Sequence, residues 1–225
     1  MTHTLHRSGP VDDQKDDFLV LAMPASGFDP RLAIARQKEF LRRSLRHDPV
    51  NIGDTAHHGW HHAERGLRPT VHWRRHSAPS PEDVIEAVDA PSPVTAVFDN
   101  YDAMRDFVEE LREADLGLSI NVSALTCSAA KCCDEVGIDR HSVEYSLGFF
   151  GRTERLPDST TLRLCTMCGH GMIGHGLAQK MISWVRTGRR TPDEASRVLA
   201  RFCNCGAFNP RRAARILGES QGDRE

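Results

Sequence analysis

Two close pairs of cysteine residues constrain the fold of this chain more than any other feature. Cys165 and Cys168 form a C-x-x-C pair, Cys203 and Cys205 form a C-x-C pair, and a glycine directly follows each pair. Thiolates two or three residues apart can reach the same ion, and four sulfur ligands suit zinc or an iron–sulfur cluster. We therefore predict a shared metal site, which requires the two pairs to meet in the folded chain.

The wider composition agrees with an intracellular metal or catalytic site. The chain has 225 residues and seven cysteines, an odd number whose tight clustering favours metal ligation or catalysis over a disulfide framework. The N-terminal segment lacks the apolar stretch of a secretory signal, and no run of ~20 apolar residues could span a bilayer. We therefore expect a cytoplasmic protein without a membrane partner. The net charge of −2 and the scattered arginines argue against a nucleic-acid partner.

The distribution of polar and apolar residues predicts four parts. We expect a disordered N-terminal arm over residues 1–17 and an α/β domain over 18–157. A histidine-rich excursion interrupts that domain at 48–80. A helical segment at 158–218 should carry the cysteine site and pack on the domain, and residues 219–225 form a tail.

Hydrophobic periodicity predicts a mixture of strands and helices. Period-two alternation or short apolar runs indicate strands at 18–23, 70–73, 94–98, 116–122 and 143–149. Capping residues and apolar stripes indicate helices at 31–46, 81–90, 101–114, 128–136, 172–186, 192–202 and 210–218. Strands and helices alternate from 81 to 150, which favours an α/β (α+β) fold with a small mixed sheet and helices on one face.

The run that follows the first cysteine pair places two histidines among four glycines. If this run is helical, His175 shares one face with Cys165 and Cys168, and His170 lies in the entry turn. Either histidine could be a ligand or a proton donor beside a metal. Both could equally be ordinary polar residues at the start of a helix.

Three glycines are candidate contacts for a cofactor. Gly169, Gly171 and Gly206 lie next to the cysteine pairs. A glycine can turn tightly and lets the backbone approach a cluster or an anion, although several glycines weaken a helix. We therefore assign these three residues to cofactor binding.

The excursion at 48–80 contains a second group of possible ligands. Its histidines follow i, i+4 spacing, so they could bind a second ion together with an acidic neighbour if the segment were helical. Surface histidines without such a role fit the pattern better. The histidines concerned are His57, His58, His61 and His62.

Three hypotheses about function remain open. The leading one is an enzyme with a [4Fe–4S] cluster on the four cysteines, which acts on a small-molecule substrate while His170 or His175 transfers protons. The first alternative is a binding or regulatory module with a structural Zn²⁺ ion. The second is a thiol oxidoreductase with a reversible Cys165–Cys168 disulfide. A homo-oligomer is compatible with each hypothesis.

Overall fold

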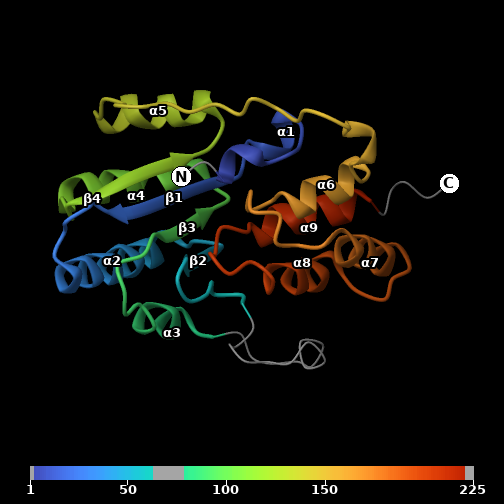
Figure 1. Cartoon of the computed structure of the whole chain (residues 1–225), viewed down its shortest axis with the longest axis horizontal. Coiled ribbons are helices and arrows are strands. Elements are labelled where there is room, and N and C mark those ends of the chain that lie inside the picture. Colours follow the sequence, from blue (N-terminus) through green and yellow to red (C-terminus); the bar gives the residue numbers. More distant parts are fainter. Residues whose placement is uncertain (1–2, 63–78, 221–225) are drawn as a thin grey trace.

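The protein is built around a four-stranded antiparallel sheet, as the computed structural model in Figure 1 shows. The structure describes residues 3–62 and 79–220. The strands follow the order β2-β3-β1-β4, and every pairing is antiparallel. The α+β class is therefore confirmed, whereas the expected mixture of parallel and antiparallel strands is wrong. The strands are β1 (Phe18–Pro24), β2 (Asn51–Asp54), β3 (Val94–Phe98) and β4 (Leu118–Ser123).

One face of the sheet packs against the helices of the first two thirds of the chain. Strand β1 alternates, so Phe18, Val20 and Ala22 point into this core, where Cys132 is also buried. Helices supply most of the opposing apolar side chains. These helices are α2 (Pro30–Ser44), α3 (Pro81–Glu86), α4 (Tyr101–Ala114) and α5 (Thr126–Val136).

The helices of the last third of the chain form a second core. This core takes Leu19 and Val97 from the sheet, together with Val50 just before β2. The four helices lie together beside one end of the sheet (Figure 1). They are α6 (Ser159–Cys165), α7 (His175–Arg186), α8 (Pro192–Ala200) and α9 (Pro210–Glu219).

Local capping signals set the starts of several helices. Ser80 and Thr191 each form a capping box with the residue three positions later, and a proline follows each of them. Asn209 accepts a hydrogen bond from the backbone N–H of Arg212 at the start of α9. No helix in the described part of the chain is both long and apolar enough to cross a bilayer.

The strand predicted at 143–149 is absent. Residues 142–150 have no regular secondary structure, and Tyr145 and Leu147 are 61% and 84% exposed. The alternation of apolar residues satisfies the pattern of a strand, but a strand also needs a partner for its backbone groups. Among the described residues, the sheet ends at β4 and this segment does not join it.

The excursion at 48–80 contains a strand that the sequence did not indicate. Residues 51–54 form β2, which pairs with β3 at the edge of the sheet. The sequence Asn-Ile-Gly-Asp is too short and too polar to show a periodic pattern. The strand predicted at 70–73 lies outside the described residues.

The segment predicted as a disordered arm at 1–17 contains a short 3₁₀ helix, His3–His6, and helix α1, Val11–Gln14. Two of its carboxylates are buried against the fully buried Arg212 of α9. The Nη2 atom of Arg212 lies 2.6 Å from Asp13 Oδ2, and its Nη1 atom lies 2.8 Å from Asp17 Oδ2. Arg163 of α6 also pairs with Asp13, at 3.0 Å. These ion pairs connect the beginning of the chain to its last helices.

Replacement of Arg212 by methionine should strongly destabilise the protein. The substitution keeps most of the side-chain volume but leaves two buried carboxylates without their main cation, which typically costs about 3–5 kcal/mol. Arg215→Met on the same helix is the control, because Arg215 is partly exposed and its ion pair with Asp16 is long, at 3.7 Å. Chemical denaturation of both variants measures the difference. Equal stability losses would contradict a special role for the buried pairs.

The same ion pairs should make the protein sensitive to acid. Burial alone would raise the pKa of Asp13, but hydrogen bonds and charges from Arg163 and Arg212 outweigh it and hold this pKa below its ordinary value of 3.8. A lowered folded-state pKa stabilises the protein above pH 3.8, and the stabilisation is lost as the pH falls through the folded-state value. Urea denaturation from pH 6 down to about pH 2 should therefore show a shallower acid loss in Asp13→Asn than in the wild type. Parallel curves would refute this assignment.

Candidate metal centre

The four predicted cysteine ligands all lie in the core of the C-terminal helices. Cys165 is the last residue of α6, and Cys168 follows in the next turn. Cys203 and Cys205 lie in the connection between α8 and α9. All four side chains are buried. Packing of α6 against α7–α9 thus brings the two halves of the constellation into one region.

Three of these cysteines and one histidine form a hydrogen-bonded cluster. The Sγ atoms of Cys203 and Cys205 lie 3.6 Å apart, and Nδ1 of His170 lies 3.4 Å from Sγ of Cys205. The thiolate of Cys168 accepts hydrogen bonds from Cys203, Cys205 and His170. We call Cys168, His170, Cys203 and Cys205 the Cys₃His cluster.

Cys165 lies outside this network. Its pKa is raised to about 11, because burial disfavours the thiolate and Asp158 adds a negative charge nearby. Neither cause involves another cysteine. His170 therefore occupies the place in the cluster that the sequence assigned to Cys165.

The backbone after Cys168 explains this exchange. The expected helical start is wrong, because α7 begins only at His175, and Gly169 and Gly171 adopt positive φ angles of 84° and 65°. Such angles suit glycine and break a helix. The resulting turn brings His170 back towards the sulfurs, whereas His175 is exposed at the beginning of α7.

Protonation within the cluster is strongly uneven. Hydrogen bonds from Cys203, Cys205 and His170 hold the pKa of Cys168 far below that of a free thiol. The bond to the Cys168 thiolate and the contact with Cys205 raise the pKa of His170 to about 10. The pKa of Cys203 is raised, because its S–H donates to Cys168 and interacts with Cys205 in a buried site. These shifts favour deprotonation of Cys168 and retention of a proton by His170 and Cys203.

The loop that carries Cys203 and Cys205 is fixed by close backbone packing on strand β2. A Cβ atom on Gly206 would lie 2.5 Å from the carbonyl oxygen of Ile52, and one on Gly53 would lie 2.6 Å from that of Cys205. The hydroxyl of Thr95 donates to the Cys205 carbonyl at 2.6 Å. Of the residues that make these contacts, only Gly206 was a candidate site residue in the sequence.

Gly59 completes this close packing from the other side. A Cβ atom on Gly59 would lie 2.6 Å from the Cα atom of Gly206. The only sequence signal for Gly53 and Gly59 was their position beside the histidine-rich run, and that signal is weak. Both glycines can therefore be assigned to the site only from the tertiary structure.

The histidines near β2 have separate structural partners. His57 contacts Asp54 through Nδ1 and lies 2.8 Å from Asp89 through Nε2. His61 donates to the carbonyl of Val50, and His62 donates to the carbonyl of Arg201. The segment is not helical, so the i, i+4 pairing expected for a second ion does not form.

The cluster is not a completed metal site. Within residues 3–62 and 79–220, no group of three or more His, Cys, Asp or Glu side chains is arranged to hold an ion as it stands. The arrangement nevertheless gathers three sulfurs and one imidazole, the donor types that bind soft and borderline metals. No family model, curated protein or solved structure matches this chain.

Proposed function

We propose that the protein is a zinc protein in which the Cys₃His cluster binds one Zn²⁺ ion and fixes the C-terminal helices to the sheet. The supporting observation is the pair of distances within the cluster. Around a tetrahedral zinc with Zn–S of about 2.3 Å and Zn–N of about 2.0–2.1 Å, two sulfurs lie about 3.8 Å apart and a sulfur and a nitrogen about 3.5 Å apart. The corresponding distances here are 3.6 Å and 3.4 Å. Small side-chain movements would therefore close the site.

The donor set favours a structural role over catalysis by the ion. Three cysteines and one histidine fill the four positions of tetrahedral zinc, whereas catalytic zinc keeps a position open for water or substrate. Hydrogen bonds from its neighbours already lower the pKa of the Cys168 thiol, which favours the thiolate that zinc binds. Zinc would replace the protons that Cys203 and His170 carry in its absence, so its binding should release protons.

The [4Fe–4S] enzyme predicted from the sequence is the competing proposal. One observation favours it, because Cys165 is buried in the same core as the other three cysteines and could supply a fourth thiolate. In such a cluster each thiolate binds a different iron, so the sulfurs are spaced more widely than two ligands of a single ion. The Cys203–Cys205 distance of 3.6 Å fits the single ion better. A small-molecule substrate and proton transfer by His170 or His175 belong to this competing proposal.

Two cysteine variants separate the proposals. Cys168→Ser should abolish stoichiometric zinc, whereas Cys165→Ser should retain about one zinc per chain. The reason is that, of these two cysteines, Cys168 contacts the other proposed ligands and Cys165 does not. The control is well matched, because both cysteines are buried and lie three residues apart. Metal and sulfide analysis of protein purified without oxygen measures the outcome.

Three results of that analysis would overturn the zinc proposal. One is about four irons with sulfide in the wild type together with their loss in Cys165→Ser, which would establish the cluster instead. Another is full zinc occupancy in Cys168→Ser. The third is a metal-free wild-type protein that forms a reversible Cys165–Cys168 disulfide, as expected for an oxidoreductase.

Removal of zinc should lower thermal stability. An ion at about a thousandfold excess over its dissociation constant contributes about 4 kcal/mol, which corresponds to roughly 10 °C in a chain of this size. Calorimetry with and without a chelator should show this loss in the wild type and in Cys165→Ser. Cys168→Ser should melt at the same temperature in both conditions. An equal effect of the chelator on all three proteins would argue against the site.

A further inference from the structure

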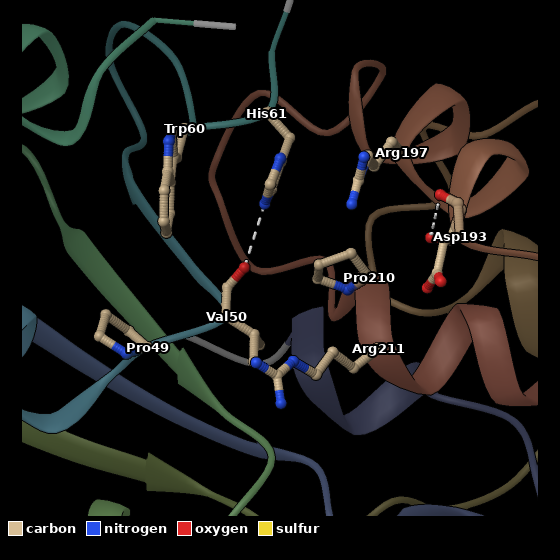
Figure 2. Close-up of a pocket in the computed structure, with 9 residues that line it drawn as sticks. Pro49, Val50, Trp60, His61, Asp193, Arg197, Pro210 and Arg211 are labelled. Atoms are coloured by element: carbon tan, nitrogen blue, oxygen red, sulfur yellow. Dashed lines mark hydrogen bonds between the residues drawn. The ribbon is translucent and has the colours of Figure 1, made fainter.

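A pocket lies between the loop around β2 and helices α8 and α9. Its volume is about 210 Å³. Figure 2 shows Trp60 and His61 on one side, Arg197 and Asp193 of α8 on the other, and Pro210 of α9 below them. Polar and apolar groups therefore face each other across a small space that is separate from the sulfurs of the cluster.

The pocket has an excess of positive charge close to His61. Arg197 lines it, and Arg201, the first residue after α8, does not line it but is close enough for its charge to act on His61. Neither guanidinium forms a hydrogen bond or ion pair with any residue that the structure describes. Arg211 also lines the pocket and is paired with Asp99 at 3.1 Å. Asp193 is the single acidic residue among the described lining residues.

Partial burial makes the lack of a counterion significant. Arg201 is partly buried and has therefore lost part of its hydration, and no described carboxylate forms an ion pair with it. A cation that is partly removed from water gains from an added anion. Arg197 is exposed, but it lines the pocket and likewise has no ion-pair partner among the described residues, so both cations would gain from an anion held there.

His61 adds a neutral and well-oriented wall. Its pKa is lowered, chiefly by burial and also by the charges of Arg197 and Arg201. The Nε2–H group donates to the carbonyl of Val50 at 3.1 Å, so Nδ1 remains as an acceptor. The ring stacks on Trp60, with centroids 5.3 Å apart and planes at 18°. This wall is mainly apolar, and the lowered pKa of His61 favours its neutral form.

We propose that this pocket binds a small anionic molecule, with its carboxylate or phosphate group on Arg197 and close to the charge of Arg201, and its apolar part against Trp60 and Pro210. The size of the pocket restricts the ligand to a small metabolite. The guanidinium of Arg197 provides the planar donors that recognise either type of oxyanion, and the nearby charge of Arg201 adds to the attraction. The assignment does not depend on which metal the cluster binds.

The pocket and the Cys₃His cluster share one structural element. Arg201 lies two residues before Cys203, and its carbonyl accepts a hydrogen bond of 2.6 Å from Nδ1 of His62. An anion in the pocket would therefore lie near the beginning of the connection that carries two of the sulfurs. The pocket is placed to sense or support the position of that connection.

Calorimetric titration of the full chain with inorganic phosphate and with succinate, at low ionic strength, tests the proposal. Arg197→Gln should weaken binding about tenfold or more, because it removes a charge-assisted hydrogen bond. Asp193→Asn should strengthen binding severalfold, because it removes the one negative charge of the pocket. Arg189→Gln is the control, since this exposed arginine lies in the turn before α8 and does not line the pocket.

The two probes distinguish the chemistry of the ligand. Saturable binding of phosphate alone would assign a phosphorylated ligand, and binding of succinate alone would assign a carboxylate. The opposite effects of Arg197→Gln and Asp193→Asn support the pocket even if one variant is less stable. The proposal is overturned if neither probe binds saturably. It is also overturned if Arg197→Gln and Arg189→Gln bind with the same affinity.

Discussion

The close contact between the backbone of the Cys203–Gly206 loop and strand β2 determines the arrangement of the C-terminal half. Side chains are absent from both sides of this contact, at Gly53 and Gly206, so the two backbones approach each other directly. The hydrogen bond from Thr95 to the Cys205 carbonyl holds the loop in place. This contact places two sulfurs at a fixed position relative to the sheet, and the turn at Gly169 brings His170 to them beside Cys168. The chemistry of the cluster therefore depends on the packing of two glycines.

The buried ion pairs of Arg212 provide a second connection across the molecule. They join residues at the beginning of the chain to α9, which follows the Cys203–Cys205 loop. Buried ion pairs contribute little net stability compared with apolar packing, but they disfavour arrangements in which a charge loses its partner. The ion pairs of Arg212 thus determine where α9 packs, and they contribute less to the overall stability of the folded protein. A metal in the cluster and the ion pairs would restrain the same helices from two directions.

The anion pocket belongs to the same group of contacts. Its walls come from the segment around β2 and from α8 and α9, the elements that also surround the sulfur loop. Zinc binding would fix this connection at Cys203 and Cys205, and an anion in the pocket would lie near Arg201, two residues before Cys203. Each ligand should therefore restrict the motion of the connection between α8 and α9, which gives the two sites a physical route for mutual influence.

The sequence by itself determined the features that depend on neighbouring residues. Capping boxes located the starts of α3 and α8, and the apolar stripe located α4 over its full length, because these signals act within one or two turns. The two cysteine pairs likewise identified the part of the chain that carries the candidate site.

Tertiary structure alone decided which residues become partners. The alternation at 143–149 found no sheet edge, whereas the short polar segment of β2 did. His170 joined the sulfurs in place of Cys165, because the turn at Gly169 interrupts the helical spacing. Partner choice depends on backbone direction and on the free space between distant segments, and no local pattern in the sequence records either of them.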